Sequence, residues 1–323
     1  MLKVVPPILA LLLAAPACAQ SDPAADYPSR AVRVIVSAPP GGGPDLVVRL
    51  LADKLQQRWR QPIVIENRPG AGGNLGTGDV AAAEPDGYTL LSAQPAPLTT
   101  NVMLYKSLRF DPSALEPIVV MTRLPIVVVV RADFPANTVA QLIAYAKANP
   151  GKVTYGSQGI GTSPHLIGAL LARRTGIALT HVPYHGTAQV VNDLVAGHLD
   201  LLIVQLDAVR ELFRAGRLKM LAVTGEHRLA ELPDIPTITQ AGGPDIRADT
   251  WNALAAPPRT PKPIIAKLNA AVNEALARPD IRARLATMSM TPAGGSPAEM
   301  AAFVRAETER WGDVIRAANI GVD

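Results

Sequence analysis

The sequence predicts an α/β fold built from two lobes that face one another. β-Branched runs alternate with helix-like segments, glycine-rich loops follow three of these runs, and one run is apolar on both faces. Alternation of this kind gives mostly parallel sheets covered by helices, with ligands at the carboxyl ends of the strands. Two glycine loops belong to the opening set of strands and the third to the middle set. A ligand cleft between two lobes is therefore expected.

The opening elements repeat one order of strand, loop and helix. A strand is predicted over residues 33–36 and a helix over 45–60, because Leu46, Val47, Leu50, Leu51 and Leu55 fall on one helical face. A strand over 62–66, a helix over 77–83 and a strand over 88–92 follow.

The middle of the chain opens with the run over residues 125–130. Apolar residues at every position predict a central strand. The next helix covers 138–149, with Thr138 as its N-cap and Pro150-Gly151 at its end. The later predicted strands are 153–155, 180–184, 200–204, 219–224 and 251–257, and the later helices are 164–175, 189–196, 261–277, 280–288 and 297–319. No internal repeat of fixed period is visible.

Residues 1–19 have the organisation of a secretory signal peptide. Lys3 precedes an apolar stretch over 4–13, and Ala17 and Ala19 favour cleavage before Gln20. The apolar stretch is too short to span a bilayer. Lipoprotein processing at Cys18 is the alternative, although Pro16 fits it poorly. The protein is expected in the periplasm, without disulfides because Cys18 is its one cysteine.

The composition describes a globular chain with 48% hydrophobic and 18% charged residues. The formal net charge is +4 and the basic residues are spread along the chain. Nucleic acid is therefore not an expected partner, whereas a mildly basic surface favours anionic ligands.

The three glycine loops cover residues 38–45, 67–76 and 156–163. Glycine lets successive N–H groups turn toward one point, and the following helix start adds partial positive charge. A small carboxylate or phosphate is the expected guest. No loop has glycines at i, i+2 and i+5 or a Gly-Lys-Ser/Thr ending, so nucleotides are disfavoured and no cofactor is expected.

Catalytic and metal-binding interpretations of these segments are weaker. Ser157 fails the nucleophile-elbow pattern because Tyr155 holds the first glycine place, and His165 fits better as a helix-start histidine held by its loop. His181 and His185 cannot share a helical face because Pro183 intervenes, so no metal site is expected. Asp45 is expected to cap its helix or orient its loop.

Several motifs together resemble the Bug family, the extracytoplasmic solute-binding proteins of tripartite tricarboxylate transporters. They are Gly41-Gly42-Gly43-Pro44-Asp45 and the segments 66–76, 85–90, 157–166, 181–186, 232–237 and 251–261. The resemblance implies a type II periplasmic binding fold with lobes 25–122 plus 225–323 and 123–224. It also implies capture of a mono-, di- or tricarboxylate or an acidic amino acid by a monomer that docks on membrane transporter subunits.

The resemblance and the glycine loops together assign the ligand contacts, with Asp207 contacting the far end of the ligand. The assigned residues are Pro40, Gly41, Gly42, Gly43, Asp45, Asn67, Gly70, Ala71, Gly72, Gly73, Ser157, Gly159, Gly161, Thr162, His165, Tyr184, Gly186, Thr187 and Asp207. Two alternatives remain: an exported serine hydrolase that uses Ser157 and His165 on a carboxylate ester, and a ligand-sensing subunit for a sensor kinase.

Overall fold

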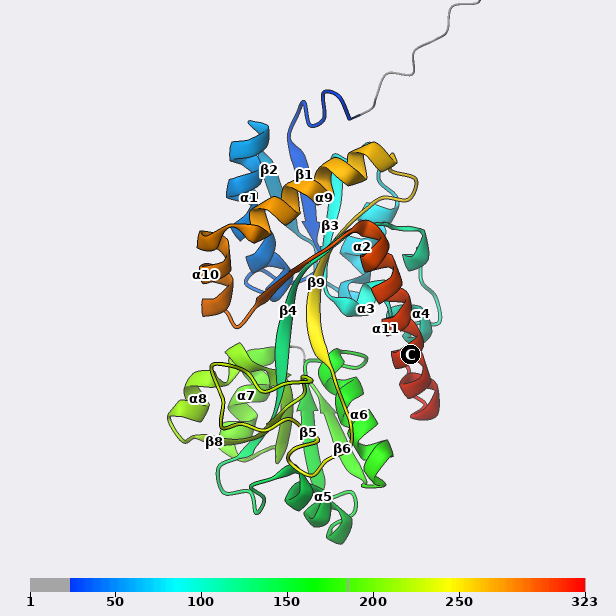
Figure 1. The fold of residues 1–323 in the computed structure, drawn as a ribbon. Coiled ribbons are helices and arrows are strands. Elements are labelled where there is room, and N and C mark those ends of the chain that lie inside the picture. Colours follow the sequence, from blue (N-terminus) through cyan, green and yellow to red (C-terminus); the bar gives the residue numbers. More distant parts are fainter. Residues whose placement is uncertain (1–23, 185, 323) are drawn as a thin grey trace, which may run out of the picture.

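One long strand joins the two halves of the fold in the computed structural model, which describes residues 24–184 and 186–322 (Figure 1). The strands are ordered β2-β1-β3-β9-β4-β7-β5-β6, and β8 and β10 both pair with β4. The predicted signal peptide lies outside the described residues. Among the described helices, none is both long and apolar enough to cross a membrane.

The first half contains three parallel strands, β1 (Val32–Val36), β2 (Ile63–Asn67) and β3 (Thr89–Ala93), and the antiparallel β9 (Asp249–Ala256). Val32, Val34 and Val36 pack in one core cluster with α1 (Gly43–Trp59) and α9 (Lys262–Ala277). Ile35 packs with Val80 on the other face of the sheet, because alternate side chains of a strand point to opposite faces. The remaining helices of this half are α2 (Asn74–Ala81), α3 (Pro95–Leu98), α4 (Asn101–Leu104) and α10 (Pro279–Thr287).

The second half contains the parallel strands β5 (Val153–Ser157), β6 (Leu179–Pro183) and β7 (Leu201–Gln205), and β8 (Leu218–Val223) beyond β4. Its helices are α5 (Val139–Ala148), α6 (Ser163–Thr175), α7 (Thr187–Ala196) and α8 (Arg210–Arg214). Residues 225–248 also lie on this half: Ile238 bonds to Val223, and Ala140 to Ala241. The sequence division had placed Gly225 onward with the first lobe.

Strand β4 (Glu116–Arg131) is much longer than its predicted length. Its first part pairs with β9 and its last part with β7 and β8, all antiparallel. Val127 and Val129 pack into one core cluster and Ile126, Val128 and Val130 into another, so both faces of this run are buried. Helix α11 (Pro297–Ala317) also contacts both halves. Its Phe303 packs against Trp251 in the first half, and its Trp311 lies in the core of the second.

The strand directions turn the two parallel sets toward each other. Because β9 is antiparallel to both β3 and β4, β3 runs in the direction of β4, and because β7 is antiparallel to β4, it runs the opposite way. Ala93 ends β3 level with Val120, and Gln205 ends β7 level with Ile126. The stretch of β4 from Val120 to Ile126 measures roughly 20 Å at about 3.4 Å per residue. The carboxyl ends of both sets therefore face one another across this interval.

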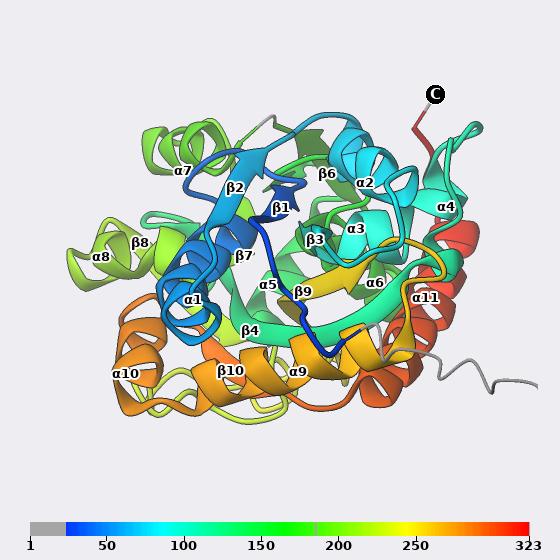
Figure 2. The same cartoon turned by 90° about the horizontal axis from the view of Figure 1, so that it is seen from above.

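The predicted α/β fold class is confirmed, and the structure adds elements that the sequence did not predict. These include the short helices α3, α4 and α8, strand β10 (Thr291–Gly294) and the antiparallel pairings of β4 and β9. Viewed from above, α9 runs along β4 and α11 lies beside α6 (Figure 2).

Candidate functional site

The first glycine loop is held by a side chain from the helix that it precedes. Gly41 has a φ of 78°, and its N–H donates to Asp45 Oδ2 at 2.9 Å. Gly42 is the N-cap of α1, has no side-chain cap, and is followed within the first turn by Pro44. The first N–H groups of a helix have no intrahelical partner, so those of Gly43 and Asp45 remain available.

Asp45 joins the first two glycine loops. This buried carboxylate also accepts from Arg49 Nε at 2.9 Å and from Asn67 Nδ2 at 3.0 Å, and Asn67 Nδ2 lies 3.1 Å from the carbonyl oxygen of Ala38. Burial by itself raises the pKa of Asp45, but the hydrogen bonds from Arg49, Gly41 and Asn67 outweigh it and the pKa is lowered. Asp45 is therefore ionised, it holds the first loop to Asn67 of the second, and its charge is compensated by Arg49.

The second loop turns sharply through left-handed backbone at Gly70, Ala71, Gly72 and Gly73. Asn101 Nδ2 donates to the Gly72 carbonyl at 3.0 Å and to Asn74 Oδ1 at 2.6 Å. A Cβ at Gly72 would lie 3.0 Å from the Tyr105 hydroxyl. The loop therefore packs closely against Asn101 of α4 and against Tyr105, and a side chain at Gly72 would have to displace them.

The third loop repeats the hydrogen bonds of the first. Gly161 has a φ of 77° and donates its N–H to His165 Nδ1 at 3.0 Å. Thr162 is the N-cap of α6 without a side-chain cap, and Pro164 lies in the first turn. Leu166 N–H bonds to Thr162 as Leu46 N–H bonds to Gly42, each at 3.0 Å. Both halves therefore present a helix start of the same construction.

Two stacked histidines lie beneath the third loop. The rings of His165 and His181 are 3.8 Å apart and 6° from parallel, and Ser157 Oγ lies 2.7 Å from His181 Nε2. Burial, and then the neighbouring His181, lowers the pKa of His165 to about 3, and burial lowers that of His181 to about 4. Both imidazoles are neutral at pH 7. Ser157 thus pairs with His181 and not with His165, the base that the hydrolase alternative requires.

These histidines predict a loss of stability in acid. Unfolded imidazoles take up protons below about pH 6.5, whereas the folded pair stays neutral to about pH 4, so the unfolded state binds more protons in this window. The free energy of unfolding should fall by up to about 1.4 kcal/mol per pH unit for each histidine between about pH 6 and 4.

Urea titrations at several pH values measure this slope. Replacing both His165 and His181 by asparagine should flatten it, whereas the same change at the exposed His227 should not. Equal slopes in the wild type and the double variant would contradict the assignment.

A fourth segment adjoins the third loop after β6. Tyr184 N–H donates to the Ser157 carbonyl at 3.0 Å, and its hydroxyl to Asp193 Oδ2 at 2.7 Å. Burial, with Asp193, raises the pKa of Tyr184 to about 12. Gly186 is the N-cap of α7 and Thr187 its first residue. His185 lies outside the described residues.

Asp207 follows β7 at the same edge of the second half. Its side chain is exposed, yet protein surrounds it on most sides, and this desolvation raises the pKa of its carboxyl. Its own N–H, that of Ala208 and the charge of Arg210 act in the opposite direction. The carboxyl is therefore accessible from solvent and more readily protonated than an ordinary aspartate.

Residues that the sequence did not single out connect the glycine loops to one another and to the strands between the halves. Thr100 Oγ1 lies 3.5 Å from the Gly161 carbonyl, and a Cβ at Gly161 would lie 2.0 Å from Leu104 Cδ1. Asn252 of β9 donates to Thr122 of β4 at 2.9 Å and lies beside Gly43. The polar run Thr99-Thr100-Asn101 after β3, and Asn252 within an apolar strand, are the signals that could have identified them. All three glycine loops therefore belong to one network of contacts.

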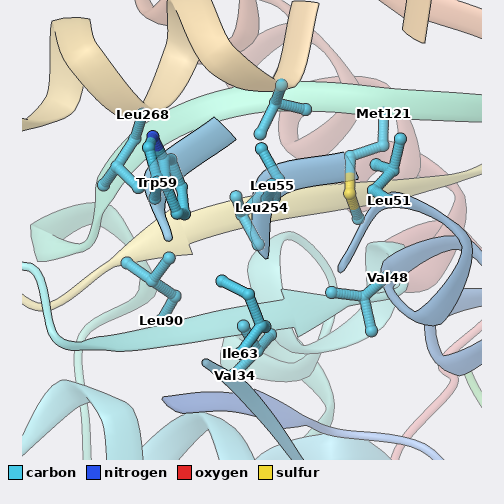
Figure 3. Close-up of a pocket in the computed structure, with 11 residues that line it drawn as sticks. Val34, Val48, Leu51, Leu55, Trp59, Ile63, Leu90, Met121, Leu254 and Leu268 are labelled. Atoms are coloured by element: carbon cyan, nitrogen blue, oxygen red, sulfur yellow. The ribbon is translucent and has the colours of Figure 1, made fainter. Parts of the chain in front are cut away.

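Two cavities lie away from these loops. A void of about 10 Å³ beneath α1 is lined by apolar side chains such as Val48, Leu51 and Leu254, which point toward one another (Figure 3). It is a packing void too small for a carboxylate. A groove of about 370 Å³ contains Asp26, Tyr88 and Pro261 near the amino ends of β1 and β3, the end opposite to the loops.

No metal centre is present in residues 24–184 and 186–322, where no three His, Cys, Asp or Glu side chains gather closely enough to hold an ion.

Comparisons with known proteins agree on one family. The family model described as "Tripartite tricarboxylate transporter family receptor" matches residues 47–320. BugT of Bordetella pertussis is 35% identical over 311 residues, covering 96% of this chain and 95% of BugT. The structure of R. palustris Rpa4515 with adipate has a TM-score of 0.84 at 36% identity, covering 92% of this chain and 99% of that one. MatC from Rhodopseudomonas palustris with bound malate has a TM-score of 0.79 at 33% identity, covering 90% and 100%.

Proposed function

This chain belongs to the tripartite tricarboxylate transporter receptor family, and on that premise we propose that it captures a small organic carboxylate in the periplasm for a tripartite transporter. It is a solute-binding receptor and not an enzyme. The bound anion lies between the two halves, among the residues that the sequence assigned to ligand contact.

The observation that carries this proposal is the meeting of two sets of strand ends across β4. Each set supplies a helix start with available N–H groups, at Gly43 and at Ser163. Hydrogen bonds to a charged acceptor are worth about 1.5–3 kcal/mol each. A few of them support micromolar binding after the costs of association are subtracted.

The charges near the loops favour recognition by main-chain groups. Arg49 is engaged by Asp45, and Arg68 by Asp79 at 3.0 Å, so neither guanidinium is a free clamp for the ligand. Asp207 would contact the distal end of the ligand, where it favours a hydroxyl, amino or protonated carboxyl group.

The relatives support a dicarboxylate of four to six carbons, since two of them hold malate and adipate. The proposal also includes export by the signal peptide at residues 1–19 and docking on membrane transporter subunits. The protein would act as a monomer and would not bind nucleic acid. The moving units would be residues 25–122 with the C-terminal region, and residues 123–224 together with 225–248, which pack on them.

Thermal melting with malate, adipate and related mono- and dicarboxylates tests the proposal. At a ligand concentration of about 100 Kd, binding should stabilise the protein by about 2.7 kcal/mol. Native mass spectrometry of protein purified without refolding should show one small acid per chain. No response to any acid in the panel and no co-purifying mass would overturn the proposal.

A further inference from the structure

The helix starts at α1 and α6 are equivalent in backbone, and they differ in the side chain that holds the preceding glycine. The equivalent glycines have φ angles of 78° and 77°, and the N-caps Gly42 and Thr162 have ψ angles of 162° and 155°. In each, the third helical residue accepts from the glycine N–H. That acceptor is Asp45 in the first half and His165 in the second.

The two acceptors have different electrostatic surroundings. Asp45 is ionised and has the Arg49 guanidinium at 2.9 Å, one turn further along the helix. The helical position equivalent to Arg49 in α6 is Ala169, which carries no charge. His165 contacts Tyr155 of β5 and His181 of β6, and among the described residues it shares no ion pair with an acidic or basic side chain.

We propose that Asp45 and His165 are matched positioning residues, which fix Gly41 and Gly161 while leaving both helix starts free of uncompensated negative charge. The first half meets this condition with an arginine and the second with a neutral ring. The inference rests on the proposed function, because it concerns how that site stays receptive to an anion.

The tautomer of His165 follows from the geometry. Nδ1 accepts the Gly161 N–H, so the ring hydrogen is on Nε2. Protonation of Nδ1 would replace this acceptor by a donor and release the loop. His181 and Ser157 complete the support: the arrangement that satisfies the contacts of Ser157 Oγ has His181 donating to Oγ and Oγ donating to the Gly159 carbonyl at 3.0 Å.

The decisive variant is His165→Asp. It keeps an acceptor for Gly161 but adds a carboxylate with no guanidinium nearby, so we expect affinity for malate or adipate, whichever binds the wild type, to fall about 10- to 100-fold at pH 7.5. The loss should shrink as the pH approaches 5, because burial at position 165 without a cationic partner raises the pKa of the new carboxyl and favours its protonated form. The wild type should show no such gain.

Two further variants separate charge from shape. His165→Asn supplies a neutral acceptor and should recover most of the affinity lost in His165→Asp. Adding Ala169→Arg to His165→Asp rebuilds in α6 the pair that α1 contains, and should restore affinity at least about fivefold, since a close charge pair offsets part of the repulsion. Equal loss in the Asn and Asp variants, or a pH-independent loss in the Asp variant, would overturn the proposal.

A readout without ligand distinguishes this inference from the proposed function. The Gly161 amide should be protected from hydrogen exchange in the wild type and His165→Asn, and exchange at least tenfold faster in His165→Ala. The ¹⁵N shift of Nδ1 should be that of an unprotonated acceptor between pH 5 and 8. Unchanged Gly161 protection in His165→Ala would refute the role of His165 even if no carboxylate binds.

Discussion

Replacing Gly161 by valine is expected to lower the free energy of unfolding by about 2–5 kcal/mol and to abolish the ligand response. Gly161 has a φ of 77°, which a β-branched residue adopts only with strain, and its Cβ would lie 2.0 Å from Leu104 Cδ1. Leu104 cannot move away freely, because it is buried and its carbonyl accepts from Val322 N–H at 2.9 Å. Urea unfolding and thermal melting with malate or adipate measure both effects.

Gly151→Val is the matched control for Gly161→Val. Gly151 has a φ of 73° and nothing within 4 Å of its Cβ position, so it reports backbone strain alone. This control should lose about 1–3 kcal/mol and keep its ligand response. Combining Gly161→Val with Leu104→Ala should relieve the clash while leaving the strain. If Gly161→Val retains full ligand stabilisation, the contact between its loop and α4 is not needed for binding.

Gly72→Val is expected to abolish ligand-induced thermal stabilisation while the chain stays folded. Its φ is 64°, and a Cβ would lie 3.0 Å from the Tyr105 hydroxyl and 3.3 Å from Asn101 Nδ2. Asn101 holds the loop through the Gly72 carbonyl, so the added side chain displaces the loop from α4. Circular dichroism and calorimetric titration separate folding from binding.

The control for this variant is Gly216→Val, at a φ of 66° with nothing within 4 Å. It should unfold at a lower temperature than the wild type by an amount similar to Gly72→Val, yet bind normally. Loss of binding in both variants would mean that general destabilisation, and not the second loop, accounts for the result.

The sequence predicted the local elements of this fold better than their partners. Strands such as β1 and β5 were predictable because their β-branched runs and following glycines lie within a few residues of each other. Most of β4 was missed because Pro117 and Pro125 interrupt its run, and its antiparallel pairing with β9 joins segments far apart in the chain. Helices α3 and α4 are single turns without a periodic pattern.

The candidate site shows the same division. Its glycine loops were visible in the sequence, whereas Thr100, Asn101 and Asn252 join them only through long-range packing. The repeated helix start was also invisible, because the two copies share little beyond Gly41/Gly161, Pro44/Pro164 and Leu46/Leu166. Backbone geometry repeats there without a repeated sequence, since an aspartate and a histidine can both accept a glycine N–H.

Strand β4 has a thermodynamic consequence beyond its place between the halves. It contributes hydrogen-bonded edges to both sheets, so melting either half leaves part of the other without its partner strand. Both sheets therefore contain part of the same continuous strand. Neither half alone has a complete set of main-chain hydrogen-bond partners. Heating should accordingly produce a single cooperative endotherm, with equal calorimetric and van't Hoff enthalpies, despite the bilobal shape.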